Sequence, residues 1–389
     1  MWRHIASNAL TFFIVLLFLF AGGISFAVKK YSAAGPLEQA ICLQVKSGAN
    51  MRAVALDLQV QGAVASANVL RIGADYADKT GQLKAGSFLV PAKASMEEIV
   101  DIVTRGGANT CGTEVVFRIG VTQSDILVRE LDPATNRFIE VAKFDPTVEE
   151  TPEEYTSTVA DADTLFRLAV AEGVTSWQVV DAMSRVELLE VDTTEVPAEG
   201  ILAPDSYDFK KGTAVSSLLE RMESSQSRIL AEAWAGRVDG LPLATPEEAL
   251  ILASLIEKET GVPTERRQVA SVFVNRLNQG IKLQTDPAVI YGITKGEGVL
   301  GRGLRRSELN RETPWNTYQI PALPPTPIAN PGRASIEAAL DPDTTEFIFF
   351  VADGTGGHAF AVTLADHNRN VAEWRKIEAA AAAAAADGG

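Results

Sequence analysis

The feature that most limits this chain is an uncharged stretch near its N-terminus, residues 9–28. Arg3 lies before the stretch, and Lys29 and Lys30 follow it. About 20 consecutive apolar residues form a helix long enough to cross the hydrocarbon core of a bilayer, and they exceed the apolar segment of a cleaved signal peptide. The sequence therefore predicts a retained transmembrane anchor. A cleaved signal peptide is the alternative.

The charges on either side of this stretch do not decide its orientation. Arg3 and the N-terminal amine roughly match Lys29 and Lys30, so the positive-inside rule favours neither direction. No later segment is apolar enough to span a membrane again. We therefore expect a short stub at residues 1–8, one anchor, and a large region on a single side of the membrane.

Composition excludes some partners. The 389 residues include 35 Lys and Arg and 50 Asp and Glu, so the net charge is −15 at pH 7. Nucleic-acid binding requires a basic surface, which this balance argues against, whereas a neutral glycan is allowed. With two cysteines and three histidines, the sequence carries no multi-Cys or Cys/His zinc motif and indicates neither a metal nor a cofactor.

The two cysteines, Cys42 and Cys111, allow two interpretations. If the region after the anchor lies outside the cytoplasm, they can form a disulfide. Alternatively they are independent buried thiols, which behave as small apolar side chains. The sequence leaves both open.

Two regions, residues 29–111 and 165–240, share the order strand, turn and amphipathic helix. In the first region, ICLQV and GSFLV are strand-like, whereas MRAVALDLQ and MEEIVDIVTR are helical. The last helix begins at a capping box of Ser95 and Glu98 and ends at Gly106-Gly107. We interpret the two regions as a weak internal duplication of a β-α module. Coincidence between two ordinary β-α units is the alternative.

The stretch between these modules, residues 112–164, reads as a β-rich insertion. TEVVFRIGVT, DILVREL and RFIEVAKF alternate in polarity, and DPATN forms a turn between the last two. These runs predict a small hairpin or meander. Residues 145–163 hold seven acidic residues and no basic one, which indicates a solvated acidic linker.

The helix predicted to begin at Thr245 carries the first candidates for chemistry. Thr245 is the expected N-cap, Pro246 takes the first position, and Glu248 completes a capping box. Glu257 lies inside this apolar helix, where an acid is costly unless it is paired or used. Glu259 follows near the helix end.

The two acids are not expected to act as a pair. Side chains two residues apart on a helix diverge by about 200°. Glu257 projects from a face of small residues, where a bulky ligand can approach. Glu259 is expected to pair with Arg266 or Arg267, or to support the site.

A polar cluster follows the next helix, at Gln284, Thr285 and Asp286. Asp286 and Pro287 also suit the N-cap and first position of another helix, so Asp286 has a purely structural alternative. Gln284 and Thr285 have no such structural reason in an otherwise apolar context.

These residues belong to a longer run that resembles the MltG/YceG family of membrane-anchored endolytic murein transglycosylases. SLIEKETG, VASVFVNRL and KLQTDPAVIYG are followed in order by PWNTY, LPPTPIANPG, FFVADGTGGHAF and TLADHNRNVAEW. The resemblance covers residues 5–377. It departs at residues 322–326, where ALPPT replaces a Gly-Leu-Pro-Pro-Gly run, and in the long insertion at 112–164.

The resemblance implies an α+β fold with a single N-terminal transmembrane helix and a mainly helical catalytic domain. It implies a bacterial inner-membrane anchor with the catalytic region on the periplasmic side. The expected parts are, in chain order, a cytoplasmic stub (1–8), the transmembrane anchor (9–28), a LysM-like membrane-proximal subdomain (29–111), the β-rich insertion with its acidic linker (112–164), a second β-α module (165–240), the transglycosylase domain (241–377) and an Ala-rich tail (378–389).

The resemblance also implies a non-hydrolytic reaction on peptidoglycan, catalysed by a carbon–oxygen lyase with one acid/base, Glu257. Burial in its apolar helix favours the protonated form that an acid needs. Glu257 would protonate the glycosidic oxygen after N-acetylmuramic acid and then take the proton of that sugar's 6-hydroxyl, leaving a 1,6-anhydro end. Cleavage of nascent strands beside the membrane would terminate glycan elongation, with peptidoglycan synthases (penicillin-binding proteins) as expected partners.

Further residues are expected to line the glycan groove or to support it, and each has a packing or turn role as its alternative. For His358, the alternative is a loop histidine whose ring is hydrogen-bonded to the backbone. They are Glu259, Gln284, Thr285, Asp286, Tyr291, Asn316, Tyr318 and His358.

Two other functions remain open from the residues alone. A non-catalytic peptidoglycan-binding scaffold would need only the LysM-like module and the anchor. A hydrolytic muramidase would need a second carboxylate beside the first.

Overall fold

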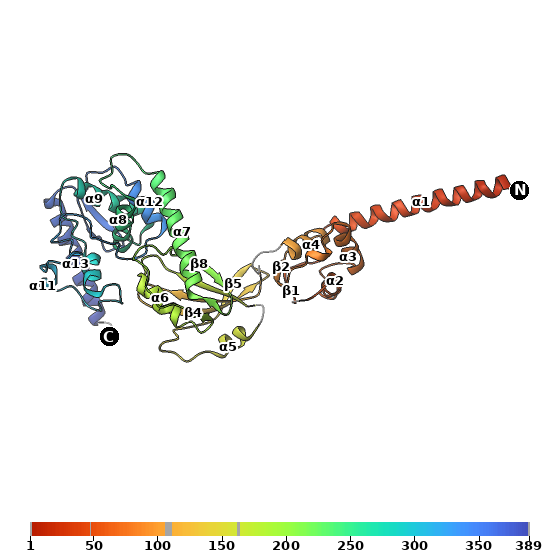
Figure 1. Cartoon of the computed structure of the whole chain (residues 1–389), viewed down its shortest axis with the longest axis horizontal. Helices are drawn as coiled ribbons and strands as arrows, with labels where there is room; N and C mark the ends of the chain where they lie inside the picture. The colour runs from red at the N-terminus through yellow and green to blue at the C-terminus, as the bar shows by residue number, and fades with distance from the viewer. Residues whose placement is uncertain (1, 47, 106–110, 162–163, 388–389) are drawn as a thin grey trace. The chain divides into compact units, whose positions relative to one another are not determined.

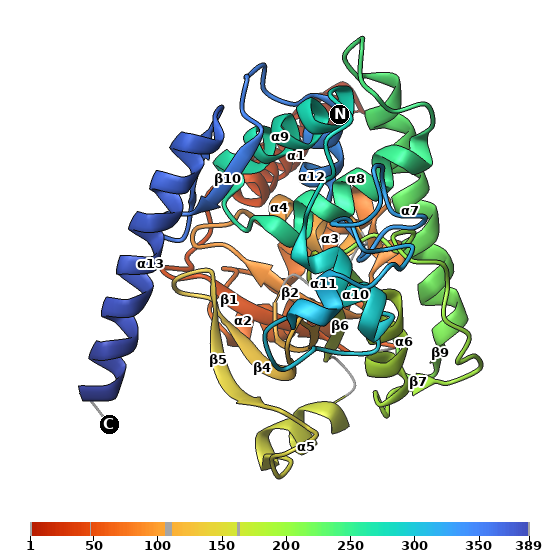
Figure 2. The same cartoon turned by 90° about the vertical axis from the view of Figure 1, so that its left-hand side faces the viewer.

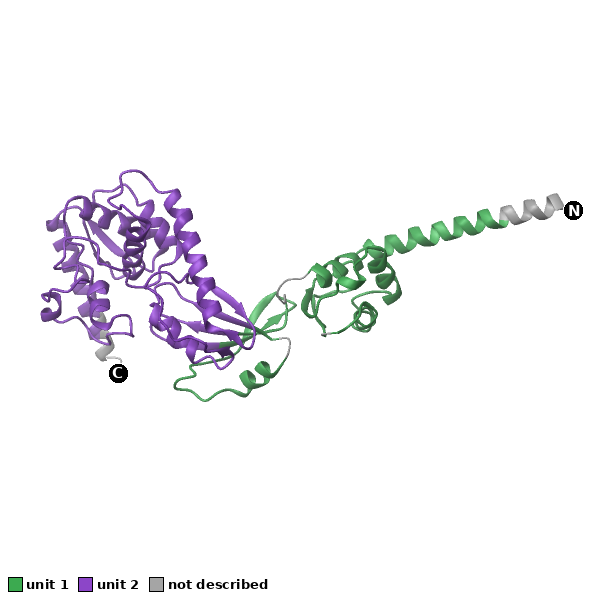
Figure 3. Cartoon of the chain, viewed as in Figure 1, with its two compact units in different colours: residues 1–115, 127–165 green, residues 116–126, 166–389 purple. Residues whose placement is uncertain are grey.

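The structure is a computed structural model that describes residues 2–46, 48–105, 111–161 and 164–387. The chain divides into two compact units (Figure 3). The first contains Met1–Val115 and Leu127–Leu165, and the second contains Val116–Ile126 and Phe166–Gly389. Each unit is described by itself.

The N-terminal helix α1 (Trp2–Ser32) contains the predicted anchor (Figure 1). Its segment Phe12–Ser32 is long and apolar enough to cross a membrane, and none of its most apolar window is buried. The helix predicted over residues 9–28 is therefore confirmed. It continues past Lys30 and contacts the helices α3 and α4 of the following module.

The module after α1 is a two-stranded antiparallel sheet covered by helices. Ile41 pairs with Val90, and Val45 with Gly86. Leu43, Leu58 and Leu70 are fully buried in its core. Its elements are β1 (Ile41–Val45), α2 (Met51–Val60), α3 (Ala67–Tyr76), the 3-10 helix η1 (Thr80–Gln82), β2 (Gly86–Val90) and α4 (Met96–Arg105).

Local sequence signals account for most of this module. The Asn50 side chain accepts a hydrogen bond from the Ala53 amide and caps α2. The predicted capping box is confirmed, because Ser95 Oγ accepts from the Glu98 amide and the Glu98 carboxylate accepts from the Ser95 amide. The expected stop at Gly106 and Gly107 lies outside the described residues. The sequence reading did not identify α3.

A disulfide joins Cys42, on β1, to Cys111. The two Cα atoms are 5.7 Å apart, within the usual range for a bridge. Of the two interpretations that the sequence left open, the disulfide is therefore confirmed. It closes a segment of 69 residues that contains the whole β-α module.

The predicted meander is confirmed as part of a larger sheet. The strand order is β5-β4-β3-β6-β8, and β6 and β8 pair antiparallel with Phe166 opposite Phe209. Asp132 Oδ1 accepts from the Ala134 amide in the predicted turn. The strands are β3 (Thr113–Ile119), β4 (Ser124–Asp132), β5 (Arg137–Phe144), β6 (Leu165–Val170) and β8 (Ser206–Phe209).

The acidic stretch predicted as a linker is partly helical, since α5 (Glu153–Ala160) lies in it. The second β-α region then adds α6 (Ser176–Ser184), which begins with a full capping box of Thr175 and Gln178. It also contains β7 (Leu189–Glu190), β9 (Thr213–Ala214) and α7 (Val215–Ala235). Both regions contain an antiparallel strand pair, β1 with β2 and β6 with β8. This agrees with a duplication, which stays a prediction.

The C-terminal part is mainly helical, as predicted, with one added hairpin. Helix α8 is apolar on all sides and packs against α7, α9, α10 and α12. The hairpin of β10 and β11 packs against α13 (Figure 2). The elements are α8 (Pro246–Glu259), η2 (Pro263–Glu265), α9 (Arg266–Asn278), α10 (Asp286–Thr294), α11 (Arg306–Leu309), α12 (Arg333–Leu340), β10 (Phe349–Ala352), β11 (His358–Ala361) and α13 (Leu364–Asp387).

Two predicted helix starts differ in detail. Thr245 Oγ1 accepts from the Glu248 amide as expected, but the Glu248 carboxylate accepts from the Ala244 amide rather than from that of Thr245. Helix α10 begins one residue earlier than predicted. Thr285 is its N-cap residue and Asp286 its first residue, although the Thr285 side chain makes no capping bond.

Candidate active site

The C-terminal end of α8 directs two carboxylates to different surroundings. Glu257 Oε2 accepts a hydrogen bond from the Gly332 amide at 3.0 Å. Its Oε1 lies 3.9 Å from Arg266 Nη2, and 5% of the Glu257 side chain is exposed. This acid is therefore held against the turn before α12 and the start of α9.

A second acid shares this location. Glu172 Oε2 lies 3.5 Å from Arg266 Nη2. Burial and the nearby Glu257 charge raise the pKa of Glu172, and Arg266 opposes them. A Cβ at Gly332 would lie 1.8 Å from Glu172 Oε1, so no other residue fits there without movement. Glu172, Glu257 and Arg266, called the Glu257 cluster below, thus link the turn after β6 to helices α8 and α9.

Lys258 also joins α8 to the turn after β6. Its Nζ donates to the Gly173 carbonyl at 3.2 Å. Burial lowers the pKa of Lys258, while Glu257 and Glu199 oppose that change. The contacts around Glu257 therefore hold backbone segments together.

Glu259 has different neighbours. Burial raises its pKa to about 7, and the Asp286 carboxylate contributes to the rise. Thr285, His358 and Arg276 oppose it. A carboxyl with this pKa is partly protonated at neutral pH, as a general acid requires.

Thr285 brings a buried hydroxyl to this place. The side chain is 2% exposed, and its Oγ1 has no hydrogen-bond partner within normal distance among the described residues. Its backbone is fixed by Thr317, whose Oγ1 accepts from the Thr285 amide at 2.9 Å and donates to the Thr285 carbonyl at 3.1 Å. The Thr285 hydroxyl thus lies beside the Glu259 carboxyl, whose pKa it lowers through a side-chain hydrogen bond.

Asp286 and Tyr318 form the next pair. The Tyr318 hydroxyl donates to Asp286 Oδ1 at 2.7 Å. Burial, this bond and the charges of Asp286 and Glu259 raise the pKa of Tyr318, and Arg276 opposes them. Glu259, Thr285, Asp286 and Tyr318 are called the Glu259 cluster below.

Gln284 is exposed beside this cluster in an unusual backbone conformation. Its φ of +55° lies in the left-handed region, which is uncommon for a residue other than glycine. The Gln284 amide donates to the Thr317 carbonyl at 3.1 Å, and Arg276 Nη1 donates to Gln284 Oε1 at 3.3 Å. The first bond fixes the Gln284 backbone, and the second ties its side-chain oxygen to the buried Arg276.

The sequence reading missed the role of Arg276, which falls outside the apolar stripe of α9. The residue is 8% exposed. Its Nε donates to the Ile348 carbonyl at 2.6 Å, and Nη1 donates to the Lys282 and Leu283 carbonyls at 3.0 and 2.9 Å. Arg276 therefore joins the segment before Gln284 to the start of β10.

His358 begins β11, and its partner is a carboxylate. Its backbone amide donates to Glu265 Oε1 at 2.9 Å, and its ring Nδ1 lies 2.8 Å from Glu265 Oε2. The Thr260 hydroxyl, at the C-cap of α8, donates to the same Oε2 at 3.4 Å. The alternative of a ring bonded to backbone is wrong. The sequence analysis did not identify Glu265. Glu265 is the last residue of the short helix η2, and no local pattern marks it as a partner of His358.

Tyr291 and Asn316 direct their side chains to partners within the protein, and Asn316 Oδ1 accepts from the Tyr318 amide at 3.0 Å. The Tyr291 ring centroid is 5.9 Å from that of Trp315, and burial and Glu199 raise its pKa. Asn316 is fully buried, and its Nδ2 donates to the carbonyls of three residues between Glu308 and Arg311. Asn316 therefore stabilises a loop and does not line an open groove.

The predicted pairing of Glu259 with Arg266 or Arg267 is wrong. Arg267 pairs with Asp341 and Asp343, at 2.5 and 2.9 Å, and Arg266 belongs to the Glu257 cluster. Glu259 instead lies near Asp286 at the start of α10 and near His358 at the start of β11. Two residues apart on α8, the side chains of Glu257 and Glu259 point in different directions and so meet different neighbours.

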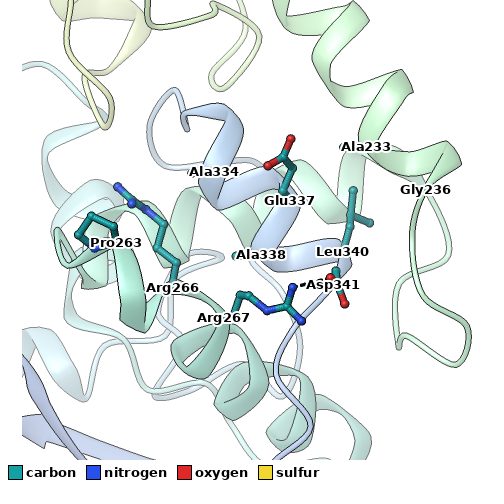
Figure 4. Close-up of a pocket in the computed structure, with 10 residues that line it drawn as sticks. All are labelled: Ala233, Gly236, Pro263, Arg266, Arg267, Ala334, Glu337, Ala338, Leu340 and Asp341. Atoms are coloured by element: carbon teal, nitrogen blue, oxygen red, sulfur yellow. Dashed lines mark hydrogen bonds and ion pairs between the residues drawn. The ribbon is translucent and has the colours of Figure 1, made fainter.

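A cavity of about 410 Å³ lies on the α12 side of this region (Figure 4). Arg266 and Arg267 of α9 line it together with residues of α7 and α12, and the Arg267–Asp341 pair is part of the lining. It contains no member of the Glu259 cluster. Among the described residues, no group of three His, Cys, Asp or Glu side chains is placed to hold a metal ion.

Comparison with known proteins adds independent information. The model of the YceG-like family matches residues 43–373. An endolytic murein transglycosylase of Streptococcus pneumoniae is 27% identical over 386 residues, which cover 95% of this chain and 65% of that protein. One of Bacillus subtilis is 37% identical over 174 residues, which cover 44% of this chain and 47% of that protein.

A solved structure is also similar. The crystal structure of a yceG-like protein from Listeria monocytogenes matches 85% of this chain and 99% of its own, at 22% identity and a TM-score of 0.45. The matched part of this chain spans 65% of the length of the S. pneumoniae relative and 47% of that of the B. subtilis relative.

Proposed function

Because the chain belongs to the YceG-like family, we propose that it is an endolytic murein transglycosylase that cleaves peptidoglycan glycan strands. The names of relatives in S. pneumoniae and B. subtilis support this substrate. The structural observation that carries the proposal is the Glu259 cluster, in which a carboxyl with a pKa of about 7 lies beside the buried Thr285 hydroxyl and the exposed Asp286 carboxylate.

We assign the acid/base role to Glu259 rather than to Glu257, which the sequence favoured. Glu257 already accepts a hydrogen bond from the Gly332 amide and faces Arg266 and Glu172. Glu259 lies near Thr285 and the exposed Asp286 instead, and burial raises its pKa to about 7, so it is partly protonated at neutral pH. A general acid must be protonated before the reaction and must reach the substrate. The raised pKa of Glu259 supports the first requirement, and the exposed Gln284 and Asp286 near it support the second.

In the proposed reaction the Glu259 carboxyl donates its proton to the glycosidic oxygen after N-acetylmuramic acid. The bond from that oxygen to C1 breaks, and C1 gains oxocarbenium character. The 6-hydroxyl oxygen of the same sugar then bonds to C1 and releases its proton to the Glu259 carboxylate. One strand ends in a 1,6-anhydro sugar and the other in a free hydroxyl, and no water is consumed.

The residues around the acid supply binding groups. The Thr285 hydroxyl and the exposed Gln284 amide can bond sugar hydroxyl and acetamido groups. Tyr318 holds the Asp286 carboxylate through its 2.7 Å bond, and the remaining lone pairs of Asp286 can accept from the glycan. Tyr291 and Asn316 are left out of this proposal because their side chains face other partners.

Asp286 also favours one alternative. Its charge acts on Glu259, so the two carboxyls are neighbours. A hydrolase would use such a pair, with Asp286 activating water or attacking C1. The products separate the two reactions, because hydrolysis leaves reducing ends and transglycosylation leaves anhydro ends.

The deciding experiment is mass spectrometry of glycan strands digested by the full-length chain. We expect anhydro ends from the wild type, and a loss of about 10²-fold or more in Glu259→Gln. Glu257→Gln is the matched control, of equal chemistry two residues away, and should retain more activity if its role is structural. Reducing ends would support the hydrolase, and no cleavage would support a binding scaffold. If Glu257→Gln alone is inactive, the assignment between the acids is wrong.

We further propose that α1 anchors the chain once in the inner membrane, with both units on the periplasmic side, where peptidoglycan lies. The disulfide supports an oxidising compartment. The helix pair between β1 and β2 supports a LysM-like, glycan-binding module at residues 29–111. Cleavage beside the membrane would act on nascent strands and terminate their elongation, next to peptidoglycan synthases. Protease protection of intact and opened cells tests this orientation.

A further inference from the structure

Helix α3 exposes two large apolar side chains. Ile72 is 61% exposed and Tyr76 is 95% exposed. They are one helical turn apart and share one side of α3. The buried stripe of α3, at Ala67, Leu70 and Ala74, lies on a different side. The core of the module therefore does not account for Ile72 and Tyr76.

This exposed side adjoins the contact between α3 and α1. A Cβ at Gly73 would lie 2.2 Å from Cε2 of Tyr31, so the Tyr31 ring rests directly on the α3 backbone. Helical geometry puts Ile72 and Tyr76 beside Gly73 and away from the buried stripe. Figure 1 shows α3 at the side of this module from which α1 emerges.

The contact with Tyr31 determines the depth of α3 relative to a bilayer. The uncharged stretch ends at Val28, and Tyr31 follows three residues later, a rise of about 4.5 Å along the helix. The headgroup region on each side of the hydrocarbon core is about 5–7 Å thick. If α1 spans the membrane, Tyr31 and the part of α3 that it touches lie at headgroup level.

We propose that α3 is a membrane-contact surface, with Ile72 and Tyr76 inserted at the boundary between phospholipid headgroups and acyl chains. The proposal rests on α1 being a retained anchor, but not on the reaction. Tyrosine is favoured at this boundary, because its ring is apolar and its hydroxyl reaches water. Helix α4 also contacts α1, but its exposed Glu97 and Glu98 favour water. The exposed charges of α3, Arg71 and Asp75, lie on the flank of that helix away from Gly73, so Ile72 and Tyr76 form the side that enters.

This contact would give the module a fixed position on the bilayer. A single helix leaves the attached domain free to pivot, whereas a second point of contact restricts that motion. The Cys42–Cys111 disulfide ties β1 to the end of the module. The chain that leaves the module at Cys111 would then start at a defined height above the membrane.

The test uses the full-length chain in phosphatidylcholine vesicles, with an environment-sensitive fluorophore on one introduced cysteine. The introduced thiol is the only free one, because the two native cysteines are bonded to each other. Ile72→Cys and Tyr76→Cys report on α3. Leu56→Cys on α2, 51% exposed in the wild type, is the matched control. Vesicle flotation and glycan cleavage are measured on the same samples.

We expect a blue shift at positions 72 and 76, with quenching by lipid-borne nitroxides near the headgroup, and neither effect at position 56. If the chain floats with the vesicles but all three positions report water, the α3 proposal is overturned and the anchor stands. If the chain does not float, both are overturned. Cleavage of glycan strands, present or absent, bears on the proposed reaction alone.

Discussion

Two carboxylates that are two residues apart on α8 have different physical roles. The carboxylate of Glu257 is used within the protein, through the Gly332 amide and Arg266. Glu259 reaches a polar cluster in which burial raises its pKa to about 7. Of these two neighbouring acids, we therefore interpret Glu257 as structural and Glu259 as the candidate catalytic acid.

The pH dependence of cleavage follows from the raised pKa of Glu259. The acid step needs the protonated carboxyl, so kcat/KM should fall as the pH rises through about 7. Values of kcat/KM measured from pH 5 to 9 would show this fall, which is the alkaline limb of the pH profile. Asp286→Asn removes a charge that raises the pKa of Glu259, so the limb should move to lower pH. A rate that stays flat across pH 7 would contradict the role of Glu259.

At the scale of elements, Glu265 connects η2 to β11 and to the C-cap of α8. Its carboxylate accepts from the His358 amide and the Thr260 hydroxyl and contacts the His358 ring. A Cβ at Gly357 would lie 2.5 Å from Glu265 Oε1, so this strand approaches closely. Since Thr260 follows Glu259, Glu265 acts as a positioning residue for the acid.

Glu265→Gln should lower kcat by about tenfold to a hundredfold, because a shift of about 1 Å in a catalytic group has that effect. KM should change little, and the alkaline limb should move, since His358 opposes the rise in the Glu259 pKa. Steady-state rates across pH measure both. Glu337→Gln, at an exposed glutamate on α12, is the control. A loss of stability with an unchanged pH profile would show a merely structural role.

Arg276 has a similar connecting role between α9, the segment before α10, and β10. Arg276→Ala removes four hydrogen bonds, three to the carbonyls of residues 282, 283 and 348 and one to Gln284 Oε1. We expect a loss of about 3–5 kcal/mol in the free energy of unfolding, measured by urea denaturation. Arg375→Ala on the exposed side of α13 should have little effect. Equal stability of the two variants would contradict this role.

At the scale of the whole molecule, the disulfide should stabilise the first unit only. Closing a segment of 69 residues stabilises a fold by about 4 kcal/mol in the chain-entropy model. Replacing both Cys42 and Cys111 by serine should therefore speed hydrogen exchange in β1 and β2 and leave α8 in the second unit unchanged. Equal protection of β1 with and without the bridge would refute the prediction.

The parts of the fold that follow from neighbouring residues were predictable. The anchor depends on composition over about 20 residues. The β1–β2 module, the meander and the helix starts depend on alternation and on caps such as Ser95 with Glu98. Helix α3 was missed although Ser66 caps it. Its apolar residues are few, and glycine within a helix weakens the pattern.

By itself, the sequence determined the long apolar N-terminal helix, the acidic composition, the pair of cysteines and the helix that carries both acids. Only the tertiary structure decided that Glu259, rather than Glu257, meets the polar cluster. The burial of each carboxyl and the charges near it depend on the elements that pack around α8. Glu265 and His358 are 93 positions apart, and Arg276 bonds the Ile348 carbonyl 72 positions away. Contacts of that span leave no local pattern, since they exist only after the elements have packed.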